Sequence, residues 1–217
     1  MATPKPHSNL PSRAHLRDAL SQIGQEIDDR PLRTSALARI VRETFGGSDA
    51  SGAWSWRMAY DMMQAAAAMR IARAGTGDVG RLSGLLASRL LTETRRSEQQ
   101  IRLQQFSTPL PYAELVARAA AIGPGDTVLE PSAGTGTLAA FALHAGAKPI
   151  LNEIDPFRRS LLEAVFETDV TGFDAEHIDD LLPTTDRPSV VVMNPPFASS
   201  VDRSRDRHIA AKHLISA

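Results

Sequence analysis

The chain has 217 residues, a formal net charge of −1 and no cysteine. The lack of cysteine excludes disulfides and thiolate metal sites, and it favours a reducing cytoplasm as the compartment. The near-neutral charge gives no global basic signature for nucleic acid, and no apolar run is long enough to span a membrane. The length fits one ordinary domain with a smaller helical one.

The first hundred residues follow helical periodicity. Apolar residues that recur every three or four positions, each series bounded by cap or glycine signals, predict four helices. The first helix contains Leu16 to Ile27, and the second runs from Thr34 to Phe45. The third runs from about Trp54 to Arg73, and the fourth contains Leu82 to Leu90. The apolar side chains at this spacing are interpreted as core residues rather than cofactor ligands. We therefore expect a helical N-terminal domain over residues 1–104.

From Phe106 onward, short apolar runs alternate with helical segments. The runs are Thr127–Leu129, Pro149–Leu151, Val170–Phe173 and Ser189–Met193, and the helices are expected at about Thr137–His144, Pro156–Glu167 and Glu176–Leu182. This alternation predicts an open parallel sheet with right-handed crossovers. The fold class is therefore α/β, with a helical N-terminal region followed by a sheet of about four parallel strands.

The first run ends at Glu130 and continues into the turn Pro131–Gly136. Gly134 and Gly136 in this turn allow the backbone to approach a ligand closely. A helix that begins near Thr137 would point its positive N-terminus at the same space. Taken alone, this glycine pattern is weak evidence, since most such matches are ordinary turns.

Polar side chains also follow the later runs. Glu153 comes 17 residues after Gly136, close to the spacing at which an acid meets a ribose hydroxyl pair. The other interpretation is a charge at the start of the next helix, with Asp155 as its N-cap. Ligands of open parallel sheets bind beyond the carboxyl ends of the strands. We therefore expect Glu130, Glu153, Asp174 and Asn194 along one edge of the sheet.

The tetrapeptide Asn194-Pro195-Pro196-Phe197 ends the last run. Its side-chain carbonyl, backbone carbonyl and aromatic ring are the groups needed to hold a planar amino group for methyl transfer. Two acceptors, the Asn194 amide oxygen and the Pro195 carbonyl, would favour a pyramidal nitrogen, and the prolines keep the backbone extended. Phe197 would stack on a base flipped out of a duplex. Without the preceding motifs, the tetrapeptide would be interpreted as a turn that ends a strand.

Together these motifs resemble the series found in class I, S-adenosylmethionine-dependent N6-adenine DNA methyltransferases. The matching segments are Glu-Pro-Ser-Ala-Gly-Thr-Gly, Asn-Glu-Ile-Asp, Phe-Asp-Ala and Asn-Pro-Pro-Phe, with Gln-Phe-Ser-Thr-Pro at 105–109 before them. The resemblance covers about Gln105 to Phe197. It implies a Rossmann-like methyltransferase domain over residues 105–217, incomplete at its C-terminal end, with S-adenosylmethionine as cofactor, DNA as partner and no metal.

The same resemblance implies a role for each motif residue. The residues around the methionine part of the cofactor would be Phe106, Thr108, Pro109, Glu130, Ser132, Gly134, Thr135 and Gly136. Those around its ribose and adenine would be Glu153, Ile154, Asp174 and Ala175. The target base would be handled by Asn194, Pro195, Pro196 and Phe197. Neither a metal nor a covalent intermediate is required, because positioning carries most of such catalysis.

A second resemblance covers the N-terminal part. Gly52 to Trp56 and Thr94 to Glu98 are similar to the start of large mobile-element proteins that fuse a methyltransferase to a helicase of the strawberry notch type. Those proteins are much longer than this chain, and the sheet expected here lacks the later strands of a full methyltransferase sheet. We therefore expect an N-terminal fragment of a longer protein, with a helicase region in the same polypeptide, or the product of a truncated gene.

Other functions remain open at this stage. Asn-Pro-Pro before an aromatic residue also occurs in enzymes that methylate protein glutamine or ribosomal RNA guanine, although the Glu-Pro-Ser-Ala-Gly loop favours DNA. A non-catalytic scaffold or antirestriction module would place the interaction in the helical region. A nicotinamide dehydrogenase would explain the glycines and Glu153 but not Asn-Pro-Pro-Phe.

Overall fold

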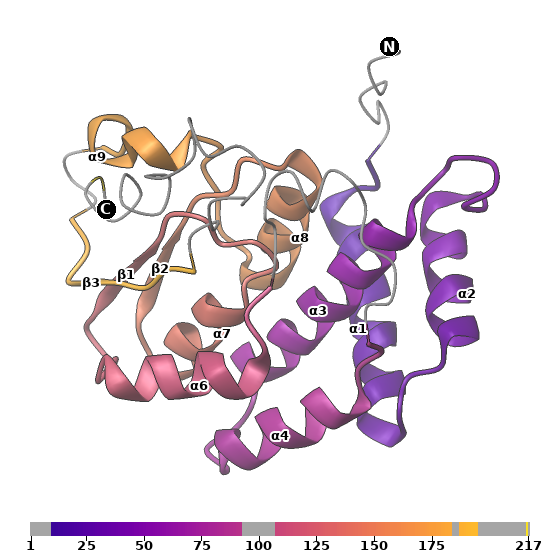
Figure 1. The fold of residues 1–217 in the computed structure, drawn as a ribbon, viewed down its shortest axis with the longest axis horizontal. Coiled ribbons are helices and arrows are strands. Elements are labelled where there is room, and N and C mark those ends of the chain that lie inside the picture. The colour runs from indigo at the N-terminus through magenta and orange to yellow at the C-terminus, as the bar shows by residue number, and fades with distance from the viewer. Residues whose placement is uncertain (1–9, 93–106, 184–186, 195–215, 217) are drawn as a thin grey trace, which may run out of the picture.

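The computed structural model describes residues 10–92, 107–183, 187–194 and 216 (Figure 1). The helices are α1 (Arg13–Asp29), α2 (Thr34–Phe45), α3 (Trp56–Ala72), α4 (Val79–Arg89), α6 (Leu110–Ala119), α7 (Thr137–His144), α8 (Pro156–Phe166) and α9 (Ile178–Leu181), with a 3₁₀ turn, η1 (Ala175–His177), before α9. The strands are β1 (Thr127–Glu130), β2 (Lys148–Leu151) and β3 (Val190–Val191). The helices α7 and α8 lie between the sheet and the N-terminal helices (Figure 1).

The four predicted N-terminal helices are confirmed, and side-chain caps define where three of them begin. Ser12 accepts a hydrogen bond from the His15 amide at the start of α1, and Ser55 accepts one from the Met58 amide at the start of α3. Asp78 does the same for α4. Because a side-chain acceptor satisfies amide groups that have no partner within the helix, each cap stabilises its helix by about 1 kcal/mol. The Ser55 cap also explains why α3 begins at Trp56 rather than at Trp54.

The helix α6 was not predicted from the sequence. Its buried residues Leu110 and Ala113 face the core, and it packs against α4 and α7. Its first turn contains Pro111, and its N-cap is Pro109. Proline is tolerated at this end of a helix because the first amides have no partner within the helix. The helix follows Ser107 and Thr108, with only its N-cap Pro109 between, and holds these two residues beside the sheet.

The sheet is parallel, in the order β2-β1-β3, and is smaller than predicted. The sequence predicted about four strands, but the run Val170–Phe173 forms only one parallel bridge, between Thr171 and Asn152. The side chain of Asn152 accepts from the Phe173 amide at 2.8 Å and donates to the Phe173 carbonyl at 3.0 Å. These bonds use the backbone groups that would otherwise continue the ladder. The last strand is also shorter than the predicted Ser189–Met193.

One hydrophobic core joins the helical region to the sheet. The alanines 65–68 of α3 are at most 1% exposed, and α3 packs against both α7 and α8. The same cluster runs from Leu16 of α1 to Val192 after β3. The boundary expected near residue 104 falls in the segment 93–106, outside the described residues, so the division into two domains stays a prediction.

Two glycines of the loop after β1 should respond differently to alanine. Both have positive φ, +58° at Gly134 and +82° at Gly136, so a side chain at either costs about 1–2 kcal/mol of backbone strain. An added Cβ at Gly134 meets nothing within 4 Å, but one at Gly136 would lie 2.5 Å from Phe166 Cε2 and 2.8 Å from Leu162 Cδ2. Overpacking adds about 1–3 kcal/mol. In urea unfolding, Gly136→Ala should therefore lose about 2–5 kcal/mol and Gly134→Ala only about 1–2, and equal losses would contradict this packing.

Candidate functional site

The loop from Pro131 to Gly136 connects β1 to α7 at the carboxyl end of the strand. The Ala133 amide donates to the Asn152 carbonyl at 2.9 Å, and the Gly136 amide donates to the Ala133 carbonyl at 2.8 Å. Gly136 packs against α8, whereas Gly134 faces open space. The loop is therefore anchored at one glycine and accessible at the other, which suits a ligand that lies against backbone atoms.

Glu130 ends β1 and is only 3% exposed. Its Oε2 accepts a hydrogen bond from the Ala139 amide at 2.9 Å, in the first turn of α7. The sequence predicted that this helix end would face a ligand, but the chain's own carboxylate partly satisfies it. Burial raises the pKa of Glu130 well above its usual value; the Ala139 bond opposes this shift and the charge of Glu153 adds to it. A cation bound beside Glu130 would favour the charged carboxylate and lower this pKa.

The raised pKa of Glu130 predicts a pH dependence of stability. The folded state binds this proton more tightly than the unfolded state, so the free energy of unfolding falls as pH rises above about 4.5, by at most about 1.4 kcal/mol per pH unit for one proton. Glu130→Gln keeps an acceptor for the Ala139 amide but has no proton to lose. Urea unfolding between pH 5 and 8 should give a flatter profile for this variant than for the wild type, and parallel profiles would contradict the assignment.

Glu153 links the glycine loop to the segment after β2. Its Oε2 accepts from the Gly134 amide at 2.7 Å, and its Oε1 accepts from the Asp155 amide at 2.8 Å. Burial raises the pKa of Glu153 above its usual value, and these two bonds and the positive charge of Arg158 only partly offset the shift. The capping interpretation is right for Asp155, whose Oδ1 accepts from the Phe157 and Arg158 amides. Both roles proposed for this acidic pair are thus compatible with the geometry.

Asn152 is a positioning residue that the sequence analysis missed. It is 1% exposed, and its amide makes four hydrogen bonds. The nitrogen donates to the carbonyls of Pro131 and Phe173, and the oxygen accepts from the Thr171 hydroxyl and the Phe173 amide, all within 3.0 Å. One side chain therefore joins the ends of β1, β2 and the Thr171 segment. A polar amide directly after a buried strand was the signal that could have revealed it.

Three segments far apart in the sequence line one pocket at this edge. Asn194, which follows β3, donates from Nδ2 to Thr108 Oγ1 at 3.1 Å. Ser107 Oγ lies 3.3 Å from Thr135 Oγ1. The pocket is lined by Ser107, Thr108, Glu130, Ser132, Ala133, Gly134, Thr135, Thr137, Leu138 and Asn194.

The pocket collects six of the twelve predicted site residues that lie in the described part of the chain. Those that line it are Thr108, Glu130, Ser132, Gly134, Thr135 and Asn194. Others lie outside its lining: Pro109 caps α6, Gly136 packs against α8, Glu153 binds the Gly134 amide, Ile154 is 57% exposed, Asp174 caps η1 and Ala175 is buried. Phe106, Pro195, Pro196 and Phe197 lie outside the described residues.

Neither a metal-binding group of side chains nor a membrane-spanning helix occurs in the described part of the chain. Within residues 10–92, 107–183, 187–194 and 216, no three His, Asp or Glu side chains are grouped so that they could hold a metal ion. In the same part of the chain, no helix is both long enough and apolar enough to cross a bilayer.

Comparison with known proteins gives little further information. No protein-family model matches the chain, and no curated protein does. Among solved structures, the chain is similar to the crystal structure of a "putative RNA methyltransferase" from Pyrococcus horikoshii, with 25% sequence identity over 65% of this chain and 68% of the other and a TM-score of 0.47. A TM-score of this size does not establish a shared fold.

Proposed function

We propose that the chain is an S-adenosylmethionine-dependent methyltransferase module that acts on the N6 amino group of adenine in DNA. The observation that carries this proposal is the position of Asn194. Its amide binds Thr108 and lines the same pocket as Glu130 and Gly134, although these residues come from separate motifs. The proposed donor and acceptor sites therefore lie within reach of one another at the carboxyl end of the sheet, where ligands of such sheets bind.

The residues around the pocket fit the proposed cofactor. Glu130 supplies a buried carboxylate for its ammonium group, and the open side of Gly134 gives access to the loop backbone. Glu153 lies behind that loop and would hold the ribose hydroxyls, and the exposed Ile154 offers an apolar surface for the adenine. When bound, the cofactor would supply an electrophilic methyl group on a sulfonium.

Asn194 would hold the target amine. In the structure its Nδ2 donates to Thr108 Oγ1 at 3.1 Å. The proposed role requires the amide oxygen to accept a hydrogen bond from one N–H of the target amino group. The Pro195 carbonyl would accept a hydrogen bond from the other N–H. The adenine nitrogen is a poor nucleophile because its lone pair is delocalised into the ring, and two acceptors would favour the pyramidal form that attacks the methyl group. Orientation is then the main catalytic effect.

DNA as the acceptor rests on the sequence motifs. The loop Glu130–Gly136 and the segment Gln105–Pro109 resemble those of DNA adenine methyltransferases more than those of enzymes that act on RNA guanine or protein glutamine. The helicase region in the same polypeptide rests on the resemblance of the N-terminal part and belongs to the same proposal.

The proposal is tested in two stages. Equilibrium dialysis should first detect binding of S-adenosylmethionine, and the absence of binding would refute the methyltransferase function. Transfer of a tritiated methyl group is then compared on duplex DNA, RNA and protein. Label recovered as N6-methyladenine supports the proposal, and label found only in RNA or protein would overturn the DNA assignment while leaving methyl transfer in place.

A further inference from the structure

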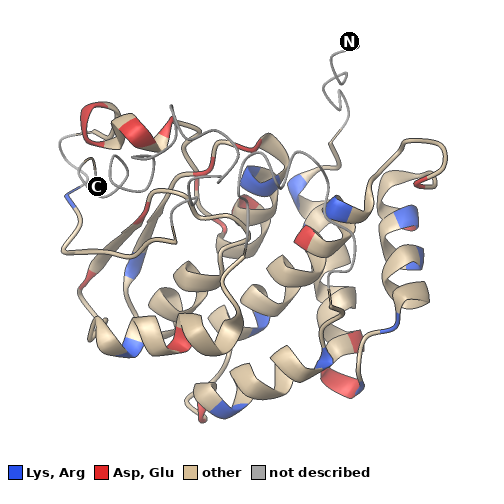
Figure 2. Ribbon diagram, in the orientation of Figure 1, with Lys and Arg blue, Asp and Glu red and all other residues tan. Residues whose placement is uncertain are grey.

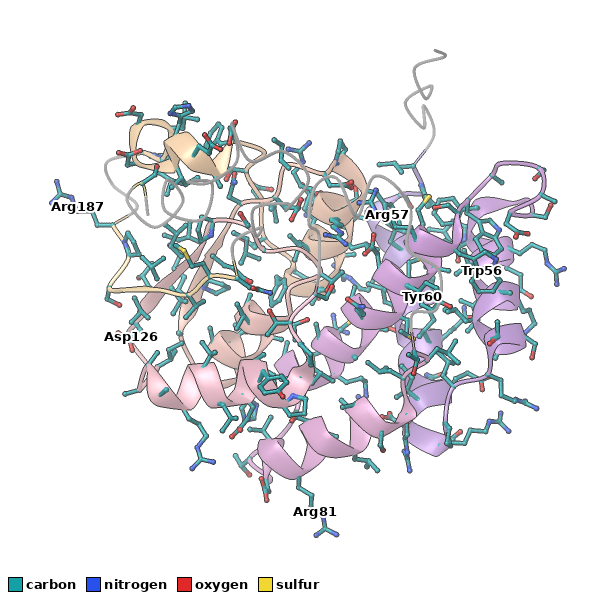
Figure 3. All side chains as sticks on the ribbon, in the orientation of Figure 1. Trp56, Arg57, Tyr60, Arg81, Asp126 and Arg187 are labelled. Atoms are coloured by element: carbon teal, nitrogen blue, oxygen red, sulfur yellow. The ribbon has the colours of Figure 1, made fainter. Side chains whose placement is uncertain are left out.

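Four charged residues form a cluster where the start of α3 meets the start of α8. Arg158 of α8 donates from Nε and Nη2 to Asp61 Oδ1 of α3 at 3.1 and 2.8 Å, and both side chains are 4% exposed. Arg57, one turn before Asp61, donates from Nη2 to Asp155 Oδ2 at 2.5 Å. Arg57 lies at the start of α3 and points toward α8 (Figure 3). We call these four residues, Arg57, Asp61, Asp155 and Arg158, the charge cluster.

The charge cluster is connected to the proposed cofactor site. Asp155 is bound by Arg57 on its Oδ2, and its own amide donates to Glu153 Oε1. The other oxygen of Glu153 accepts from Gly134 in the loop that lines the pocket. A continuous path of hydrogen bonds therefore runs from α3, through Asp155, to Glu153 and the glycine loop. Acidic and basic residues lie close together at this junction (Figure 2).

The composition of the charge cluster argues for a role beyond stability. An apolar set of similar volume often stabilises a fold as well as a buried ion pair does, because desolvation offsets the attraction between the charges. Charged pairs instead fix a geometry, since each hydrogen bond has a preferred direction and length. Here the geometry that is fixed is that of Asp155. Burial raises the pKa of its carboxyl group, but the hydrogen bonds and charges of Arg57 and Arg158 together outweigh burial and lower it.

We propose that Arg57 and Asp61 of α3 are positioning residues for the ribose end of the cofactor, acting through Asp155 on Glu153. This inference rests on the proposed function and extends it to the helical region, which would then form the back of the binding site. Arg57 holds Asp155, and the Asp155 amide holds Glu153 in place for the ribose hydroxyls. Asp61 binds Arg158, and its Oδ2 lies 3.6 Å from Arg57 Nε, an ion pair that would orient Arg57. The helical region thus determines how well the protein distinguishes a ribose from a deoxyribose in its ligand.

The test compares two ligands, S-adenosylhomocysteine and its 2′-deoxy analogue, by isothermal titration calorimetry on the full chain. The wild type should prefer the ribose form by at least about tenfold, because a hydrogen bond to a charged acceptor is lost in the analogue. Arg57→Leu should reduce this preference to about threefold or less. Arg57→Lys keeps a positive charge within reach of Asp155 and should restore most of the preference.

Arg70→Leu is the matched control. Arg70 also lies on α3 and forms an ion pair, with Asp28 of α1 at 2.6 Å, but it does not touch Asp155 or Glu153. Its ligand preference should equal that of the wild type. If Arg57→Leu weakens both ligands by the same factor, or keeps the full preference, the positioning role is wrong. If the wild type binds both ligands equally, Glu153 does not hold the ribose and the inference falls alone; if it binds neither ligand, the proposed function falls with it.

Discussion

Replacing Asn194 by alanine is expected to lower the rate of methyl transfer at least about 100-fold while leaving the affinity for S-adenosylmethionine within about tenfold. The variant removes the amide oxygen proposed to accept from the target amine, but it leaves Glu130, Gly134 and Glu153 intact. The measurement is single-turnover transfer of labelled methyl, with a parallel binding titration.

Ser189→Ala is the control for this variant. Ser189 precedes β3 as Asn194 follows it, and its hydroxyl donates to Asp126 Oδ1 at 2.8 Å, at the opposite end of the strand. Its loss should weaken the attachment of β3 to β1 without touching the pocket, so transfer by the folded protein should be unchanged. Lost binding with preserved turnover in Asn194→Ala would contradict the division of roles between Asn194 and the glycine loop.

Asp61→Ala is expected to destabilise the fold by about 3–5 kcal/mol, because it leaves the guanidinium of Arg158 buried without its carboxylate. Arg158 is 3% exposed and makes two hydrogen bonds to Asp61. Burial alone would lower the pKa of Arg158, but the charge and hydrogen bonds of Asp61, together with the charges of Glu153 and Asp155, reverse the shift and raise it. The measurement is urea unfolding followed by circular dichroism, with the slope checked for two-state behaviour.

Two further variants separate the buried pair from ion pairs in general. Asp28→Ala removes the partner of Arg70, but these side chains are 33% and 40% exposed, so the loss should stay within about 1 kcal/mol. The double variant Asp61→Leu with Arg158→Met replaces both charges by apolar groups and should recover most of the stability lost in Asp61→Ala. A double variant no more stable than Asp61→Ala would show that the cost comes from elsewhere.

Local patterns were sufficient for most of the helices. The spacing of Leu16, Leu20 and Ile23 predicted α1, and the structure buries all three. The predicted run at Val170 failed as a strand because the Asn152 side chain binds the backbone of Phe173, and no local pattern specifies the partner of a side chain twenty residues away. The helix α6 was missed although Pro111 and the spacing of Leu110 and Ala113 are typical of a helix start.

The sequence predicted which motif residues would lie together, but not which side chains would hold them in position. The order of motifs placed Glu130, Gly134 and Asn194 together, and the structure gathers them around one pocket. The contact between Asp61 and Arg158 joins residues 97 positions apart, and each lies within an ordinary helical pattern. Both acids and arginines are common on exposed helix faces, so the sequence gives no sign that these two are buried against one another.

The alanine run of α3 has a practical consequence for anyone who wishes to divide the protein. The side chains of residues 65–68 are small enough to let α3 approach α7 closely. Ala140 and Ala142 of α7 are equally small, and both are fully buried. A truncated protein that begins near residue 105 would expose that side of α7 and α8 to water. An exposed apolar surface of this kind promotes aggregation. Recombinant work on the pocket should therefore retain the first hundred residues.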